Sequence, residues 1–276
     1  MIDVIMAEIW YDGEQRRGIL KTLTVEMNQN IAILTIKSPP ANALSSALIN
    51  DLDQKLDELE QDQAVKAVVL KGDGRFFSAG ADIKEFTSLQ NASDYQSLSE
   101  KGQQVFERIE HFSVPVIAAI HGAALGGGLE LAMACHVRTV TKDAKLGLPE
   151  LTLGIIPGFA GTQRLPRYVG TAKAYEMILS GTPISGEQAY ELGLVNHVFT
   201  DEEIFDETMK LATKFAEKSK PTINKIMQLI PYAQTDQFSA GVQKEAEAFG
   251  EVFGTDDAKE GVQAFIEKRK PNFRDK

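Results

Sequence analysis

The sequence predicts an α/β core followed by a helical C-terminal section. Short apolar runs typical of buried strands alternate with helix-competent segments until about residue 200, and helical spacing alone continues beyond that point. The chain has 276 residues, of which 43% are hydrophobic and 25% charged, which fits one large domain with or without a small appendage. We therefore divide it into an N-terminal extension (1–20), an α/β core (21–200) and a C-terminal helical region (201–276).

The core begins with a predicted hairpin. Leu23–Met27 and Ile31–Ile36 are strand-like and flank the turn sequence Asn-Gln-Asn. Ser45 is a suitable N-cap for a helix over Ala47–Glu60, whose leucines recur at helical spacing. A short buried strand is expected at Ala67–Leu70, and a loop rich in glycine, aspartate and serine follows it.

The remaining elements are predicted from the same patterns, namely short apolar runs for strands and apolar residues at helical spacing for helices. A loop punctuated by glycine and proline is expected at Leu153–Gly161. The other expected elements are, in order, a helix at about 93–111, strands at Val116–Ile120, Val137–Thr141 and Lys145–Leu148, and helices over Ala172–Leu179, Ser185–Leu192, Glu202–Lys218, Thr222–Leu229, Phe238–Phe253 and Asp256–Lys268.

Net charge and cysteine content limit which binding partners and which cellular compartment are expected. The formal net charge is −10, from 29 basic and 39 acidic residues, which disfavours nucleic-acid or anionic-membrane binding but not a local grip on an anionic ligand. Cys135 is the only cysteine, so no intrachain disulfide can form, and its apolar context is typical of a buried residue. No apolar run approaches about 18 residues and no signal pattern opens the chain, so we expect a cytoplasmic protein.

The most informative segment is the turn at Gly126–Gly128, which joins a predicted strand to a helix-competent run carrying Glu130. Glycines without Cβ atoms leave the backbone open where the first turn of a helix has unpaired N–H groups. Glu130 lies one turn after Gly127, so a backbone donor and a carboxylate would share one space, which suits proton transfer next to a polarised carbonyl. A simple flexible turn is the alternative. The segment lacks the lysine of a phosphate-binding loop, and the acidic residue would repel phosphate.

Two further segments carry candidate residues. Arg75–Ile83 (RFFSAGADI) follows a buried strand, a common ligand position in α/β proteins, although a tight turn before a helix would also explain it. Glu150 comes 20 residues after Glu130, and the intervening strands could return it beside Glu130. Alternatively, it is a solvated glutamate in a turn. The four histidines have no metal-ligand spacing, and no Gly-x-Ser-x-Gly elbow occurs.

Together these segments resemble the crotonase superfamily, and most closely its enoyl-CoA hydratases. The resemblance spans roughly residues 22–273 and is carried by FFSAGADIKEF (Phe76–Phe86), IAAIHGAALGGGLELAMAC (Ile117–Cys135), GLPELTLGIIPGFAGTQRL (Gly147–Leu165) and AKEGVQAFIEKRKPNF (Ala258–Phe273). It implies a crotonase (ClpP-like) fold of repeated ββα units, with a C-terminal helical region that forms a homotrimer or a dimer of trimers.

The resemblance also implies a site for a CoA thioester. Glu130 and Glu150 match the two catalytic glutamates, and the N–H groups of Ala81 and Gly127 match an oxyanion hole. No metal and no cofactor are expected, since CoA is part of the substrate. The residues expected to contact substrate are Ser78, Ala79, Asp82, Ile83, Lys84, Gly126, Pro149, Phe159 and Lys270, the last as a CoA phosphate contact that could reach a neighbouring subunit.

Two glutamates favour a hydratase that adds water to a trans-2-enoyl-CoA in fatty-acid β-oxidation. The alternatives are an enoyl-CoA isomerase, a hydratase for a branched (methylglutaconyl-type) substrate, and an RNA-binding homologue, which the net charge disfavours. Phe159 stands where a small residue is frequent in such hydratases, and Leu148 where a polar residue is common. Both departures leave the acyl preference open.

Overall fold

A six-stranded sheet forms the centre of the protein. The computed structural model describes residues 22–82, 85, 91–235 and 237–276, and the predicted extension 1–20 lies outside them. The sheet order is β1-β2-β3-β4-β6-β9, with only the β1–β2 pair antiparallel. Its strands are β1 (Leu23–Asn28), β2 (Ile31–Ile36), β3 (Ala67–Gly72), β4 (Val116–Ile120), β6 (Val137–Thr141) and β9 (His197–Phe199).

A second sheet of three short strands positions the glycine turn. It consists of β5 (Ala123–Leu125), β7 (Lys145–Gly147) and β8 (Ile184–Ser185), in the order β5-β7-β8. β5 runs parallel to β7, with Leu125 opposite Gly147, and β7 is antiparallel to β8. The end of β5 therefore lies beside the end of β7, and the chain leaves both strands at one place.

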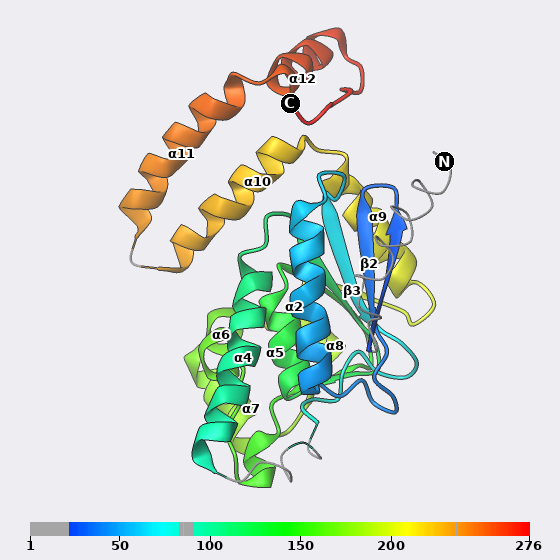
Figure 1. The fold of residues 1–276 in the computed structure, drawn as a ribbon, viewed down its shortest axis with the longest axis vertical. Helices are drawn as coiled ribbons and strands as arrows, with labels where there is room; N and C mark the ends of the chain where they lie inside the picture. The colour runs from blue at the N-terminus through cyan, green and yellow to red at the C-terminus, as the bar shows by residue number, and fades with distance from the viewer. Residues whose placement is uncertain (1–21, 83–84, 86–90, 236) are drawn as a thin grey trace, which may run out of the picture.

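Helices surround the two sheets and continue beyond them (Figure 1). They are α2 (Ser46–Gln61), α4 (Ala92–Glu110), α5 (Gly127–Ala134), α6 (Gly161–Val169), α7 (Thr171–Ser180), α8 (Gly186–Glu191), α9 (Ile204–Ala216), α10 (Lys220–Leu229), α11 (Phe238–Phe253) and α12 (Asp256–Glu267), with short 3₁₀ helices at η1 (Glu150–Leu153) and η2 (Ile230–Gln234).

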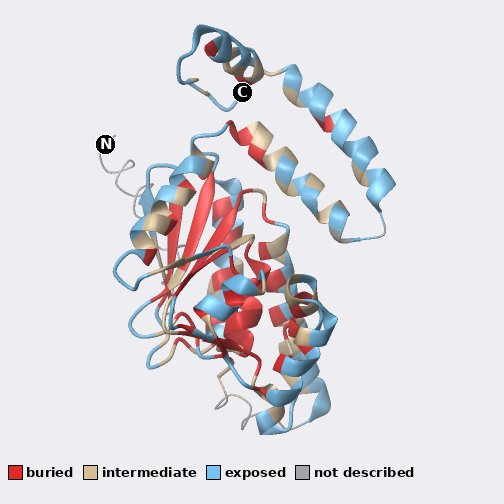
Figure 2. Ribbon diagram, turned by 180° about the vertical axis from the view of Figure 1, so that it is seen from behind, coloured by how far each residue is buried: buried red, intermediate tan, exposed pale blue. Residues whose placement is uncertain are grey.

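The large sheet is buried on both faces, as parallel sheets generally are. In β2, Ala32, Leu34 and Ile36 point into the core formed with α2, α4 and α5. Ile31 and Ile33 point to the opposite face, where α9 covers them. This alternation explains why every residue of β2 is buried, and Figure 2 shows the strands as the buried centre of the molecule.

Local signals explain α2. The Ser45 side chain accepts a hydrogen bond from the Leu48 N–H at 3.2 Å, which satisfies one otherwise unpaired donor of the first turn. Leu48, Leu52 and Leu56 recur every four residues and are buried against the sheet. The helix thus forms where the sequence predicted it, one residue longer at each end.

The helices α10, α11 and α12 form an arm that extends away from the α/β body and is mostly exposed (Figures 1 and 2). The C-terminal tail ties this arm back. Asp275 Oδ1 lies 2.8 Å from Lys66 Nζ and accepts the Lys220 N–H at 2.7 Å. Buried Asp257 accepts the N–H groups of Arg274 and Asp275 at 2.7 and 2.9 Å. The base of the arm is therefore fixed to the start of β3.

The predicted architecture is confirmed, with an α/β core and helices in the C-terminal section. β4, β6 and α11 have the predicted bounds, whereas β5, α6 and β9 were not expected. α9 falls within the predicted C-terminal region 201–276, yet it packs on the sheet of the core. Among the residues with described structure, no helix combines the length and apolarity needed to cross a bilayer.

Candidate active site

The glycine turn starts α5 and is held by the end of β7. Gly126 has φ +52°, which favours glycine, and its N–H donates to the Gly147 carbonyl at 2.9 Å. A Cβ on Gly128 would lie 2.4 Å from the Ser78 carbonyl oxygen, and one on Gly127 would lie 3.0 Å from Leu44 Cδ1. These two glycines therefore allow close packing inside the protein. The sequence predicted that all three glycines leave room for a ligand, whereas Gly127 and Gly128 face other protein atoms.

The segment from Ser78 to Asp82 lies beside the turn and changes partners within four residues. The Ser78 N–H donates to the Ala123 carbonyl at 3.1 Å, so Ser78 pairs with the end of the small sheet. After Gly80, which has φ +109°, the Asp82 N–H donates to the Leu44 carbonyl at 3.2 Å. Since successive residues of an extended chain alternate in direction, the intervening Ala81 N–H points away from Leu44.

The two predicted donors thus belong to adjacent segments. A Cβ on Gly80 would lie 3.0 Å from the Leu125 carbonyl oxygen, and one on Gly126 would lie 3.8 Å from Gly80 Cα. Gly127 is the first residue of α5, so its N–H has no acceptor within the helix. The arrangement is compatible with the predicted pairing of the Ala81 and Gly127 amides, which stays a prediction.

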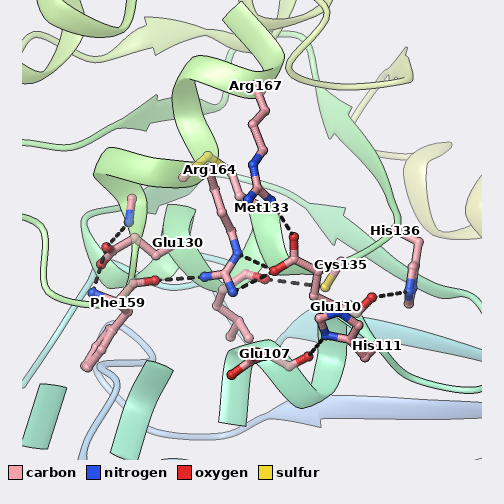
Figure 3. A network of polar contacts seen from close by, with 12 residues as sticks. Glu107, Glu110, His111, Glu130, Met133, Cys135, His136, Phe159, Arg164 and Arg167 are labelled. Carbon is pink, nitrogen blue, oxygen red and sulfur yellow. Dashed lines mark hydrogen bonds and ion pairs between the residues drawn. The ribbon is translucent and has the colours of Figure 1, made fainter. Parts of the chain in front are cut away.

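Glu130 lies in the first turn of α5 and is 1% exposed. Its Oε1 accepts the N–H groups of Phe159 at 2.8 Å and Gly161 at 2.6 Å (Figure 3). Burial raises the pKa of Glu130 to about 7, and the charge of Glu150 acts in the same direction, while the two amides and Arg164 oppose the rise. This side chain can therefore both accept and release a proton near neutral pH.

Glu150 is the second carboxyl and begins η1 immediately after Pro149. Its Oε1 would lie 3.0 Å from a Cβ on Gly126, which places the carboxyl against the glycine turn. Its Oε2 is buried without a hydrogen-bond partner. Burial also raises the pKa of Glu150. A buried, unpaired oxygen of this kind would gain a hydrogen bond from a water molecule or a ligand group.

The small sheet explains how the two carboxyls converge. Pairing of Leu125 with Gly147 brings the ends of β5 and β7 together. Glu150 follows three residues after Gly147, and Glu130 follows five residues after Leu125. The two carboxyls are close enough for the charge of Glu150 to raise the pKa of Glu130. The two carboxyls therefore lie in one region of the molecule, and their predicted catalytic pairing stays a prediction.

The other predicted contact residues are distributed unevenly. Ser78, Ala79 and Asp82 lie on the segment beside the glycine turn, whereas Ile83 and Lys84 lie outside the described residues. Lys270, which follows α12, has a 74% exposed side chain, and its Nζ lies 2.6 Å from Glu217 Oε1. Within one chain it is not brought to the two glutamates. Its predicted phosphate contact stays a prediction.

Phe159 takes part through its backbone as well as its ring. Its N–H holds Glu130, and its ring meets Phe106 of α4 edge-on, with 5.3 Å between centroids. A Cβ on Gly102 would lie 2.3 Å from the ring, and one on Gly127 would lie 3.1 Å from it. The ring therefore fills the space between α4 and α5, next to one of the predicted oxyanion donors.

Sequence reasoning missed the polar network behind Glu130, which includes Arg164 and Glu110 (Figure 3). Arg164 is buried, and it contacts both the Phe159 carbonyl and the Glu110 carboxylate. The only signal for it in the sequence is an arginine three residues after the loop expected at Leu153–Gly161, in a stretch for which no element was predicted. No local pattern points to Glu110, which is 54 residues away.

Comparison with known proteins identifies the family of the chain. Residues 26–276 match the sequence profile of the enoyl-CoA hydratase/isomerase family. A protein of Bacillus subtilis (strain 168), named as a probable enoyl-CoA hydratase, is 57% identical over 256 residues, which cover 92% of this chain and 99% of that protein. The short-chain-enoyl-CoA hydratase of Clostridium acetobutylicum is 39% identical over 91% of this chain and 97% of its own. The crystal structure of an enoyl-CoA hydratase from Bacillus anthracis superposes with a TM-score of 0.89 at 36% identity, covering 93% of this chain and all of that one.

Proposed function

Because the chain belongs to the enoyl-CoA hydratase/isomerase family, we propose that it adds water to trans-2-enoyl-CoA thioesters and forms 3-hydroxyacyl-CoA, as in fatty-acid β-oxidation. The observation that carries the proposal is the convergence of buried Glu130 and partly buried Glu150, both with raised pKa values, beside the glycine turn. A hydratase needs one group that takes a proton from water and one that gives a proton to carbon.

The thioester carbonyl would be held by main-chain donors. The N–H groups of Ala81 and Gly127 would donate to the carbonyl oxygen and stabilise the negative charge that develops there as the enolate forms. One such donor typically contributes about 10²–10³-fold in rate. The close packing of the segment 78–82 against Gly126–Gly128 would keep the two donors at a fixed separation.

The two glutamates would divide the proton transfers. Water adds its oxygen to the β-carbon while a Glu130 oxygen takes a proton from it, and Glu150 gives a proton to the α-carbon. Oε1 of Glu130 already accepts two amide hydrogen bonds, which leaves Oε2 for the water. Exchange with solvent then returns both carboxyls to their starting states, so the net change is the addition of one water molecule.

The test is hydration of crotonyl-CoA, followed by loss of the absorbance of its conjugated thioester. Glu130→Gln and Glu150→Gln keep the side-chain shape and should each reduce kcat by about 10²-fold or more. Glu107→Gln, at an exposed position on α4, serves as the matched control and should retain the wild-type rate. Near-wild-type hydration by both site variants would refute the proposal. Conversion of a 3-enoyl-CoA without hydration would instead indicate an isomerase.

We propose in addition that the chain forms a homotrimer or a dimer of trimers in the cytoplasm, with no cofactor beyond the CoA of its substrate. Large apolar side chains exposed on the arm support the assembly: Phe238, Val242, Phe249, Phe253, Phe265 and Ile266. Light scattering after size-exclusion chromatography should give about three or six times the 30.3 kDa chain mass. A monomer at micromolar concentration would contradict it.

A further inference from the structure

Arg164 lies directly behind the loop that holds Glu130. It sits in the first turn of α6, and its side chain is 6% exposed. Its Nη1 donates to the Phe159 carbonyl at 2.9 Å. Its Nε and Nη2 both donate to Glu110 Oε2, at 3.0 and 2.9 Å, at the end of α4 (Figure 3). One guanidinium therefore links α4, α6 and the loop between η1 and α6.

The loop itself needs such support. Ala160 has φ +69°, a conformation that costs a residue with a side chain roughly 1–2 kcal/mol and that the surroundings must therefore impose. The residues on either side of it, Phe159 and Gly161, supply the two N–H groups that hold Glu130. Any change in this turn would move both donors together.

Stability alone does not account for the ion pair of Arg164 with Glu110. Removing two charges from water is costly, and replacing a buried ion pair by apolar residues of similar volume is often neutral or stabilising. The planar guanidinium offers several donors in a fixed geometry, which an apolar residue or a lysine cannot reproduce. The guanidinium in this position orients the groups that it contacts, the Phe159 carbonyl and the Glu110 carboxylate.

We propose that Arg164 is a positioning residue that, with Glu110 as counter-ion, fixes the Phe159–Gly161 turn so that its two amides hold Glu130 in line for proton transfer. This inference rests on the proposed function for its kinetic consequences. Its structural part, the rigidity of the turn, is independent of any substrate.

The charges around Glu130 define a pH signature. Glu150 faces it from η1 and Arg164 from α6, and the charge of Arg164 holds the pKa of Glu130 lower than burial alone would. Arg164 in turn faces Glu110 on α4 and the Cys135 thiol at the end of α5. Loss of the guanidinium should therefore move the acidic limb of kcat/KM to higher pH, since Glu130 must be deprotonated to act as the base.

The experiment compares Arg164→Met and Arg164→Lys with Arg167→Met. Arg167 Nη1 also contacts Glu110, at Oε1 and 3.0 Å, but lies outside the contact with Phe159, which makes it the matched control. Arg164→Met should lower kcat for crotonyl-CoA by about 10–100-fold at neutral pH, with KM changed less than about threefold and the acidic limb displaced upward. Arg164→Lys should fall between it and the wild type, and Arg167→Met should keep the wild-type profile.

Hydrogen exchange read by mass spectrometry supplies the measurement that needs no activity. Amides in peptides spanning 155–165 should exchange at least about tenfold faster in Arg164→Met than in Arg167→Met. Two results together separate the two proposals. If the wild-type protein does not hydrate crotonyl-CoA but Arg164→Met still exchanges faster, the proposed function is refuted and the positioning role is supported. Unchanged local exchange, or a loss of kcat that is equal at every pH, would overturn the inference. If Arg164→Met does not fold, the same comparison is made with Arg164→Lys.

Discussion

Replacing Glu130 by glutamine should make the protein more stable at alkaline pH while it abolishes most of the activity. The folded-state pKa of Glu130 is about 7 against an ordinary value of 4.5. A raised carboxyl pKa means that the folded state binds the proton more tightly than the unfolded state does. The stability associated with this proton is thus present below pH 4.5 and is lost as the pH rises through 7.

The size of the effect follows from the same two values. Each tenfold difference in proton affinity corresponds to about 1.4 kcal/mol, so ionising Glu130 in the folded protein costs about 3 kcal/mol once the pH exceeds 8. Glutamine carries no such charge, and its carbonyl oxygen can still accept the Phe159 and Gly161 amides. For a chain of this size, 3 kcal/mol corresponds to roughly 6–12 °C in Tm.

The assay is a series of thermal melts of wild type and Glu130→Gln from pH 5 to pH 8.5, at one protein concentration because assembly also affects Tm. The difference in Tm should be small at pH 5 and should grow steadily in favour of the variant above pH 6. Glu107→Gln controls for the loss of one carboxylate. A difference that is constant with pH, or that favours the wild type at pH 8.5, would show that Glu130 ionises without penalty and would refute the reasoning.

Three further expectations concern the same region. The acidic limb of kcat/KM against pH should lie near pH 7, since Glu130 must be deprotonated to accept a proton from water, and a limb below pH 5 in steady-state hydration rates would contradict this role. Gly128→Ala should lower Tm in circular dichroism melts although alanine favours helices, because its Cβ would lie 2.4 Å from the Ser78 carbonyl oxygen, and a higher Tm would mean that this backbone contact yields easily. Ala160→Gly should raise the free energy of unfolding in urea by about 0.5–1 kcal/mol by relieving φ +69°, and a decrease would indicate that the turn is not strained.

Much of the fold could be predicted because its determinants are local. The alternation in β2 and the leucine spacing of α2 are short-range patterns that specify a strand and an amphipathic helix. α6 escaped prediction because Pro166 lies inside it and because it follows a loop rich in glycine and proline. In that case packing against α5 and α7 overrides the local signals.

The candidate site likewise contains residues that the local sequence predicts and residues whose contacts depend on how distant helices pack. Glu130 and Glu150 could be named from the sequence because each follows a strand end, and those ends meet in the small sheet. Arg164 could not be connected with Glu110, since their contact depends on how α4 and α6 pack. The meaning of Gly128 was likewise hidden, because the atom that excludes its Cβ belongs to Ser78, 50 residues earlier.

The hold on Glu130 has an evolutionary consequence. Phe159 contributes a main-chain N–H, which every residue except proline can supply, so its ring can be exchanged during divergence without detaching the carboxylate. Gly161 has no such latitude, because a Cβ there would come within 2.8 Å of Glu130 Oε1. Descendants of this chain can thus change the packing between α4 and α5 at one end of the turn, whereas a side chain at the other end would displace Glu130.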